Sequence, residues 1–283
     1  MRNPPESADI QKNKIMNKKH ITVPALLKKK EDGEKIVVLT AYDFPFAKLA
    51  DEAGMDIILV GDTLGIVVQG QESTLPVTMD QMVYHTRMVA RAAKQALVVA
   101  DMPFMSYQSG MEDTLKNAGR LMKEGGAAAV KFEGGVGITD RVEMLSRYDM
   151  PVMAHIGLTP QSVHRMGGYK VQGRSAGQAR QLIDDAKQLE SAGAFSIVLE
   201  GMPNALAKTI SETLRIPTIG IGAGPHCDGQ VLVMHDLLGL FTRFHPKFVR
   251  RYADFTAIAK EAFSRYGSDV RTGKFPNEAE GYE

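Results

Sequence analysis

Residues 56–86 contain the clearest sign of the fold, and they read DIILVGDTLGIVVQGQESTLPVTMDQMVYHT. The apolar run Ile57 to Val60 is typical of a parallel strand that is buried on both faces. A carboxylate, Asp62, follows soon after this run, where the strand must leave the core. A polar loop comes next, and Thr78 and Gln81 then have the spacing of a capping box that opens a helix. The stretch therefore predicts a strand, a loop with an acidic start and a helix.

The same alternation recurs along the chain. Short apolar segments predict strands at 36–41, 57–60, 97–100, 127–130, 151–154, 195–199, 216–221 and 231–234. Most are separated by predicted helices, at 45–53, 78–91, 111–124, 139–148, 175–193 and 204–214. This alternation, with a polar residue after nearly every strand, favours an α/β fold with a single (β/α)8 TIM barrel over an open doubly wound sheet. The connection 221–231 is short for a helical crossover, so we expect a turn there.

The length and composition fit one large domain. The chain has 283 residues, of which 44% are hydrophobic, and no linker composition divides it. We expect residues 21–283 to form the barrel domain, including an amphipathic C-terminal tail. Residues 1–20 are polar and lack the apolar core of a signal peptide, and we expect a disordered arm there.

Charge, hydropathy and cysteine content exclude several classes of protein. A formal net charge of +1 gives no electrostatic case for binding nucleic acid or an anionic membrane. No apolar run reaches the roughly 18 residues that a membrane-spanning helix needs. A single cysteine, Cys227, excludes an internal disulfide framework and a cysteine-rich metal site, and it fits a reducing compartment such as the cytoplasm. We therefore expect a cytoplasmic protein that acts on small molecules.

Acidic residues follow several of the predicted strands, namely Asp62, Asp101, Glu133 and Glu200. In a barrel the carboxyl ends of all strands meet on one face, so these side chains are predicted to share a pocket. Lys131 lies two residues before Glu133 on one strand, which puts both on the same side. Clustered carboxylates cannot all stay ionised and unpaired when partly buried. A hard divalent cation would resolve this, and an oxygen-only ligand set favours Mg²⁺ over Zn²⁺.

Each of these residues also has a purely structural interpretation. Asp62 and Asp101 are placed where a turn or helix-cap carboxylate would stand. Lys131 and Glu133 are spaced to form a structural ion pair. Glu200 is harder to explain in this way, because a carboxylate directly after a buried strand is costly if it has no role.

Other features are interpreted as structural. His155 is interpreted as a hydrogen-bonded wall residue, the glycine-rich segment 220–224 as tight backbone packing, and Cys227 as inert. The polar loops 64–77 and 158–174 follow predicted strands, and we expect them to act as lids over the pocket.

A series of motifs, in order along the chain, resembles one known family. The motifs are VGDTLG (60–65), STLPVT (73–78), YHT (84–86), ADMPFMSY (100–107), VKFEGG (130–135), HIGLTPQS (155–162), GGYKVQGR (167–174), GIGAG (220–224) and DGQVLVMHDLLG (228–239). Together they resemble the ketopantoate hydroxymethyltransferase (3-methyl-2-oxobutanoate hydroxymethyltransferase) family. The resemblance covers roughly residues 21–266, which is nearly the whole chain.

The resemblance implies a fold, a reaction and an assembly. Members have a TIM barrel and bind Mg²⁺. They transfer a one-carbon unit from 5,10-methylenetetrahydrofolate to 3-methyl-2-oxobutanoate, which gives 2-dehydropantoate (ketopantoate) in the first step of pantothenate biosynthesis. They form homo-oligomers, commonly homodecamers, so the chain is expected to be one.

The resemblance also implies a role for each matching position. The implied metal ligands are Asp62, Asp101 and Glu133. The implied substrate-binding residues are Asp62, Thr63, Asp101 and Lys131. The implied proton acceptor, and hence the catalytic residue, is Glu200. Thr63 stands where the family often has serine, and the change keeps the hydroxyl group.

Alternative functions remain open at this point. A class I aldolase would use Lys131 as a Schiff-base nucleophile. A noncatalytic barrel is a second alternative, although the full set of acids at the strand ends argues against it. A lyase of the phosphoenolpyruvate type would share the metal chemistry, but it would need a cysteine as acid or base in a loop at a strand end, and none is found there.

Overall fold

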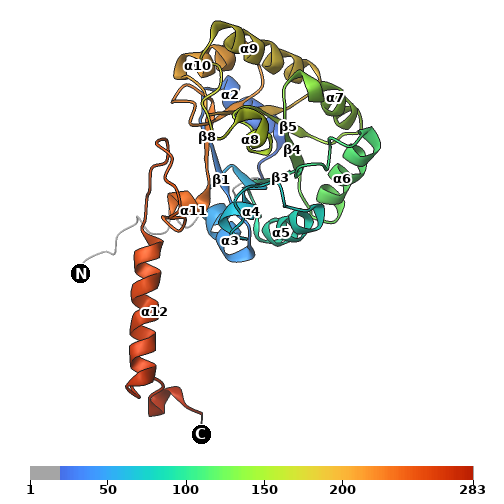
Figure 1. The fold of residues 1–283 in the computed structure, drawn as a ribbon. Helices are drawn as coiled ribbons and strands as arrows, with labels where there is room; N and C mark the ends of the chain where they lie inside the picture. The colour runs from blue at the N-terminus through green and yellow to red at the C-terminus, as the bar shows by residue number, and fades with distance from the viewer. Residues whose placement is uncertain (1–19, 283) are drawn as a thin grey trace, which may run out of the picture. The chain divides into compact units, whose positions relative to one another are not determined.

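The computed structural model describes residues 20–282, so the arm predicted at 1–20 lies outside the described residues except for His20. A closed barrel is formed by eight strands, and each strand pairs in parallel with the next along the chain (Figure 1). The strands are β1 (Ile36–Thr40), β2 (Ile57–Val60), β3 (Leu97–Asp101), β4 (Ala129–Glu133), β5 (Val152–Gly157), β6 (Ser196–Glu200), β7 (Thr218–Ile221) and β8 (Gly229–Leu232). The closed strand order confirms the predicted TIM barrel and excludes the open doubly wound sheet.

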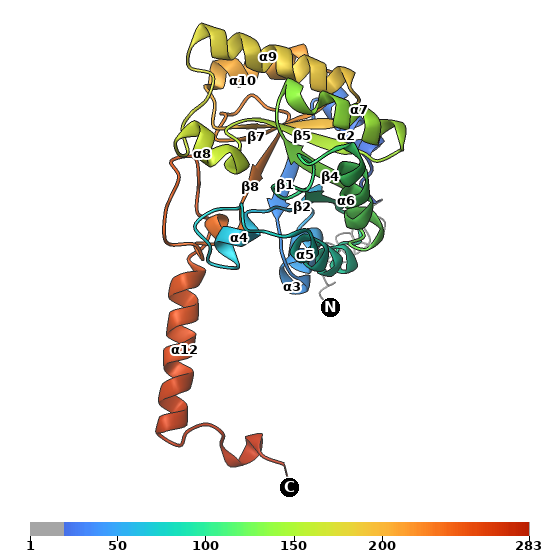
Figure 2. The same cartoon turned by 45° about the vertical axis from the view of Figure 1, so that its right-hand side comes forward.

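Helices alternate with the strands and surround the barrel (Figure 2). In the barrel they are α2 (Val23–Glu31), α3 (Phe44–Glu52), α4 (Leu64–Val67), α5 (Met79–Ala92), α6 (Met111–Lys123), α7 (Thr139–Arg147), α8 (Val163–Met166), α9 (Ala176–Ser191) and α10 (Asn204–Thr213), with the 3-10 helices η1 (Val136–Ile138) and η2 (Pro160–Ser162). The predicted capping box at the start of α5 is present, since Thr78 and Gln81 exchange both hydrogen bonds.

Packing divides the chain after Val231 into two compact units. The second unit contains α11 (Met234–Leu237), α12 (Phe255–Arg271) and the 3-10 helix η3 (Glu278–Glu280). At the start of α12 the Asp254 carboxylate accepts a hydrogen bond from the Ala257 N–H at 3.0 Å, which caps the helix. No residue of α12 is buried, and Phe263 is 74% exposed.

Two apolar clusters form the core of the barrel, and the alternation of side chains along each strand explains both. The inner cluster includes Ile57, Leu97 and Phe195, which lie at or next to the beginnings of their strands. Leu26 of α2 joins this inner cluster. The outer cluster, which includes Val98, lies between the strands and the surrounding helices. Because the apolar residues fill the first part of the barrel, the last residues of the strands are left to carry polar side chains.

The last strand differs from its predicted position. The apolar run predicted β8 at 231–234, but the strand is Gly229–Leu232, and His235 lies in α11. Gly229 pairs with Ile219 of β7, and a Cβ atom added to it would stand 2.4 Å from the Ile36 carbonyl oxygen. A glycine that lets strands approach this closely carries no apolar signal, so the pattern placed the strand two residues late. The turn predicted between β7 and β8 is confirmed.

The two loops predicted as lids contain short helices. The loop after β2 starts with α4, and the loop after β5 contains η2 and α8. Elements this short leave almost no periodic pattern, which is why the sequence did not predict them. Within residues 20–282, no helix combines the length and apolarity that a membrane crossing requires.

A glycine at the end of β5 allows close contact with β6. Gly157 has a φ of +97°, and a Cβ atom added to it would stand 2.2 Å from the Glu200 carbonyl oxygen. That same oxygen accepts a hydrogen bond from the Leu158 N–H at 2.8 Å. Both the backbone conformation and the space therefore require glycine here.

We expect Gly157→Ala to destabilise the protein by about 1–3 kcal/mol, because the added methyl group must push β5 away from β6. The matched control is Gly119→Ala in α6, where an added Cβ atom meets nothing within 4 Å. Because alanine favours helix, the control is expected to stabilise the protein by about 0.5–1 kcal/mol. Denaturant unfolding monitored by circular dichroism measures both changes. Equal unfolding midpoints for Gly157→Ala and the wild type would contradict this account.

Candidate active site

Charged side chains gather at the carboxyl ends of the strands, as the sequence predicted. Asp101, Glu133 and Glu200 are the last residues of β3, β4 and β6, and Asp62 follows β2. Lys131 pairs in register with Asp101 on the neighbouring strand. All are buried except Glu200, whose side chain is 16% exposed. The barrel therefore concentrates four carboxylates and one ammonium group at one end.

Lys131 pairs with Asp101 and not with Glu133. The Lys131 ammonium nitrogen lies 2.6 Å from Asp101 Oδ1, and both side chains are buried. Asp101 Oδ2 accepts a hydrogen bond from the Asp62 N–H at 3.0 Å, so both oxygens of this carboxylate are held. Burial alone would lower the pKa of Lys131, but the negative charges of Asp101, Glu133 and Asp62 outweigh it and raise the pKa. Lys131 is therefore a fixed cation.

Asp62 lacks sufficient positive charge around it. Its Oδ2 atom accepts a hydrogen bond from Gln161 Nε2 at 2.8 Å. Burial, together with repulsion from Asp101 and Glu133, raises the pKa of Asp62 well above its ordinary value of 3.8, and Lys131 only partly offsets this. The protein atoms alone therefore disfavour the ionised form of this carboxylate, and an added cation would favour it.

His155 lies between two of the acids, which its interpretation as a wall residue did not anticipate. It is the register partner of Glu133. Its Nδ1 atom is 3.4 Å from Glu133 Oε1, and its Nε2 atom is 3.3 Å from Glu200 Oε2, ion-pair distances without hydrogen-bond geometry. Burial and Lys131 lower the pKa of His155, but Glu133 and Glu200 outweigh them and raise it to about 9. His155 thus connects Glu200 electrostatically to the other acids.

Gln161 and Tyr107 also contact the acid cluster, although the sequence analysis assigned no role to either residue. Both are buried, and the Tyr107 hydroxyl donates to Gln161 Oε1 at 2.7 Å. They stand inside the quoted motifs ADMPFMSY and HIGLTPQS, and this was the only signal that could have identified them. A lone glutamine in a polar loop has no spacing pattern that predicts contact with an acid.

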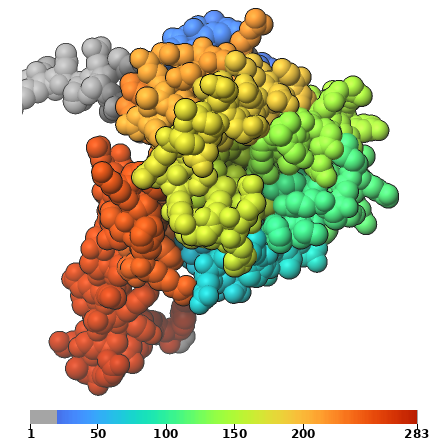
Figure 3. Space-filling model, turned by 45° about the horizontal axis from the view of Figure 1, so that its top comes forward, coloured from blue at the N-terminus to red at the C-terminus, as the bar shows by residue number. Residues whose placement is uncertain are grey.

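The loops after β2 and β5 bring further groups to the acids. Thr63 directly follows Asp62 and is partly buried, and its hydroxyl does not cap α4. In the loop 158–174, burial raises the pKa of Tyr169. The negative charges of Asp62, Glu200 and Glu133 raise this pKa further, so the Tyr169 side chain interacts electrostatically with the acid cluster. Figure 3 shows the yellow atoms around α8 against the cyan atoms of the segment that follows β2.

The chemistry of these donors fits a hard divalent cation, although the described residues form no group of three or more His, Cys, Asp or Glu that would hold a metal by itself. Mg²⁺ needs no such cage, because it keeps several waters and commonly takes only one or two carboxylates plus substrate oxygens. Burial, together with the negative charges of Asp101 and Glu133, raises the pKa of Asp62, and a bound cation would lower it. Asp62, Asp101 and Glu133 are the candidate residues for holding the ion.

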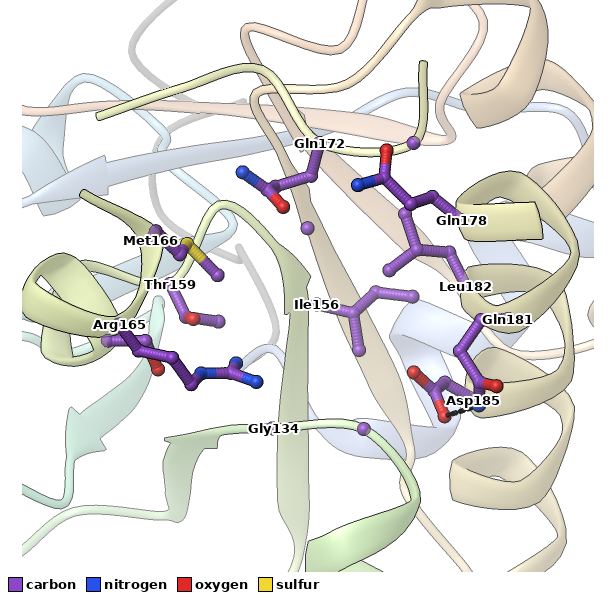
Figure 4. Close-up of a pocket in the computed structure, with 14 residues that line it drawn as sticks. Gly134, Ile156, Thr159, Arg165, Met166, Gln172, Gln178, Gln181, Leu182 and Asp185 are labelled. Carbon is purple, nitrogen blue, oxygen red and sulfur yellow. Dashed lines mark hydrogen bonds between the residues drawn. The ribbon is translucent and has the colours of Figure 1, made fainter. Parts of the chain in front are cut away.

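A cavity of about 290 Å³ is lined by residues at the ends of β4 and β5 and by residues of α8 and α9 (Figure 4). Gly134 and Gly157, which line it, stand at the ends of β4 and β5. Ile156 also lines it, and because neighbouring side chains alternate along a strand, the cavity lies on the opposite side of β5 from His155. Figure 4 shows Arg165 and Asp185 on opposite sides of this space, so it offers both a cation and an anion to a ligand.

The raised pKa of His155 gives an expectation for the metal-free protein. Because the folded pKa of about 9 is above the ordinary value of 6.5, protonated His155 adds stability that is complete below pH 6.5 and is lost as the pH rises through about 9. An NMR titration of the imidazole carbon resonances in the presence of a chelator measures this pKa. His155→Gln assigns the resonance, and a midpoint at or below 6.5 would contradict the ion-pair arrangement.

Comparisons with known proteins agree with this fold. The structure resembles a phosphonopyruvate hydrolase crystallised with oxalate and Mg²⁺, with a TM-score of 0.58 and 14% identity over 91% of this chain and 92% of that chain. It also resembles an oxaloacetate acetylhydrolase in complex with 3,3-difluorooxalacetate, with a TM-score of 0.59 and 16% identity over 90% of this chain and 88% of that chain. At these identities the likeness concerns the fold alone.

Sequence comparison is more specific. The chain is 58% identical to a 3-methyl-2-oxobutanoate hydroxymethyltransferase of Geobacter metallireducens, over 94% of this chain and 100% of that protein. It is 56% identical to proteins of the same name from Pelobacter propionicus, over 92% of this chain and 97% of that protein, and from Carboxydothermus hydrogenoformans, over 91% and 94%. The profile of one family matches residues 20–278, which include every charged residue of the acid cluster, and the chain therefore belongs to the ketopantoate hydroxymethyltransferase family.

Proposed function

We propose that this transferase adds a hydroxymethyl group from 5,10-methylenetetrahydrofolate to 3-methyl-2-oxobutanoate and so makes 2-dehydropantoate, the first step of pantothenate biosynthesis. The observation that carries the proposal is the family match over residues 20–278, with the charged residues that the motifs predict gathered at the strand ends. The reaction moves a proton from C3 of the oxo acid, forms a bond from C3 to the methylene carbon, takes the hydroxyl oxygen from one water and releases tetrahydrofolate.

Glu200 is the proposed acceptor of the C3 proton. It is the least buried acid of the cluster, with 16% of its side chain exposed, so a substrate that enters the mouth can reach it. The Nε2 atom of His155 lies 3.3 Å from Glu200 Oε2, and the positive charge of the protonated imidazole stabilises the carboxylate. Glu200 therefore combines a fixed position with access to substrate, which is what a general base needs.

Asp62, Asp101 and Glu133 are the proposed holders of Mg²⁺. When bound there, Mg²⁺ supplies a Lewis acid for the keto and carboxylate oxygens of the oxo acid. The support for this set is that the three carboxylates are buried at one end of the barrel, where burial and then the charges of Asp101 and Glu133 raise the pKa of Asp62. Asp62 and Asp101 are also proposed to contact the substrate from the same positions.

Lys131 and Thr63 are also proposed to bind the substrate, in addition to Asp62 and Asp101. Lys131 adds positive potential where negative charge develops on the substrate oxygens. The Thr63 hydroxyl and backbone are proposed to bind the substrate carboxylate. Because Asp101 keeps Lys131 protonated at 2.6 Å, the neutral amine that an aldolase Schiff base requires is disfavoured, which argues against that alternative.

The chain is also proposed to act in the cytoplasm as a homo-oligomer, with a homodecamer as the expected state. An unburied apolar side of α12 supports the oligomer, since Phe263 and Tyr266 are both exposed there. Residues 21–283 are proposed to form the catalytic barrel domain of each subunit, including the C-terminal tail.

The first test combines product formation with metal removal. The purified chain should convert 3-methyl-2-oxobutanoate and 5,10-methylenetetrahydrofolate to 2-dehydropantoate, measured by mass spectrometry. EDTA should abolish the activity and added Mg²⁺ should restore it, because Mg²⁺ is the proposed Lewis acid of the reaction. Borohydride trapping of a substrate adduct on Lys131, with activity that survives EDTA, would instead support the class I aldolase.

A second test isolates the proton acceptor. Glu200→Gln should slow deuterium wash-in at C3 of the oxo acid in D₂O by about 10²-fold or more, since the amide cannot take the proton. Glu212→Gln, at an exposed position of α10, is the matched control and should exchange at the wild-type rate. Proton NMR of the C3 position follows the exchange. Retained wash-in in Glu200→Gln would remove Glu200 from the role of base.

A further inference from the structure

Gln161 makes an unusual number of contacts for a residue in a loop. It lies in η2, directly after β5, and is 7% exposed. Its backbone N–H donates to Glu133 Oε2 at 3.0 Å, and its side-chain Nε2 donates to Asp62 Oδ2 at 2.8 Å. One residue thus binds two of the proposed metal ligands, which come from different strands of the barrel.

The orientation of the Gln161 side-chain amide is determined by its partners. Nε2 faces two acceptors, Asp62 Oδ2 and the Met102 carbonyl oxygen, the latter at 3.0 Å. Oε1 faces two donors, the Tyr107 hydroxyl at 2.7 Å and Gln108 Nε2 at 3.3 Å. Rotating the amide by half a turn would place oxygen against oxygen and nitrogen against donors, so only one orientation satisfies all four contacts.

Each acid uses only one oxygen for Gln161. At Asp62 the Gln161 amide donates to Oδ2 and not to the other oxygen, Oδ1. The other oxygen of Glu133, Oε1, faces His155 at 3.4 Å. Gln161 therefore fixes how each carboxylate is turned, and at Asp62 it leaves an oxygen available to a cation.

Tyr107 supports the Gln161 side chain through a hydrogen bond. Its hydroxyl lies 2.7 Å from Gln161 Oε1, and its ring packs against Phe132 with the ring centroids 5.0 Å apart. Its carbonyl oxygen accepts hydrogen bonds from Arg141 Nε at 2.7 Å and Thr114 Oγ1 at 3.1 Å. The tyrosine is thus fixed at both its backbone and its ring, and it is a rigid support for the amide.

We propose that Gln161, supported by Tyr107, is a positioning residue that orients Asp62 and Glu133 for the divalent cation. The inference rests on the proposed function, because that function places the cation at these acids. If Gln161 only anchored its loop to the barrel, its hydrogen bond to the Met102 carbonyl oxygen would be enough. The hydrogen bonds to Glu133 and Asp62 would then not be needed. Partners of this kind, which orient metal ligands, commonly change metal affinity by about 10–100-fold when they are removed.

The test compares three variants. Gln161→Met removes both polar atoms of the amide at similar length and keeps the backbone N–H that donates to Glu133. Tyr107→Phe removes the hydroxyl group, which supports the amide and also contacts the Glu133 backbone. Gln188→Met, at an exposed position of α9, is the control for the same chemical change away from the site. Mn²⁺ is the probe, and its dissociation constant is measured from the free-ion signal in electron paramagnetic resonance.

We expect Gln161→Met to weaken Mn²⁺ binding about 10–100-fold, Tyr107→Phe to weaken it less, and Gln188→Met to leave it unchanged. Raising Mg²⁺ to saturation should return most of kcat to Gln161→Met, because Glu200 and Lys131 are intact. A loss caused by general misfolding would not show this recovery of kcat.

Equal Mn²⁺ affinities for Gln161→Met and Gln188→Met would overturn the proposal, as would a wild-type protein that binds no Mn²⁺. If Gln161→Met does not fold, Tyr107→Phe decides, and unchanged Mn²⁺ affinity in that variant also overturns the proposal. The proposed function fails separately: a wild-type protein that makes no 2-dehydropantoate, but whose Mn²⁺ affinity falls in Gln161→Met, contradicts the function and supports the positioning role.

Discussion

The acid cluster confines like charges in a small buried space, and most other features of this end of the barrel compensate for that. Asp62, Asp101 and Glu133 are each less than a tenth exposed. Isolated carboxylates removed from water in this way are strongly destabilised, so each needs a cation or a hydrogen-bond donor. Lys131 pairs with Asp101, and His155 stands between Glu133 and Glu200. Within the described part of the chain, Asp62 has no cation paired with it, which supports the proposal that a divalent ion binds here.

Strand register provides the geometry. Asp101 is level with Lys131, Glu133 with His155, and Gly157 with Glu200 on neighbouring parallel strands. Lys131 and Asp101, and likewise His155 and Glu133, are therefore brought side by side by the pairing of the backbone. The apolar inner cluster fills the other end of the barrel and so keeps these registers in place.

The sequence predicted the fold and the charged residues because both leave regular signals. Apolar runs that end in Asp101, Glu133 or Glu200 predict a strand and a polar rim together, without any knowledge of contacts. His155 and Gln161 were not assigned to the acids, since their contacts join strands and loops that are distant along the chain. The position of β8 was missed because Gly229, which allows the closure, contributes no side chain to the pattern.

The distribution of the charges over separate strands also has a consequence for how such an enzyme can change over time. No single loop carries the reactive groups, since Asp101, Glu133 and Glu200 are the last residues of three different strands. A connection beyond a strand can therefore gain or lose residues, and so reshape what enters the mouth, while the chemistry stays with the barrel. Descendants of one ancestor can in this way adopt new substrates without first rebuilding the machinery that handles charge.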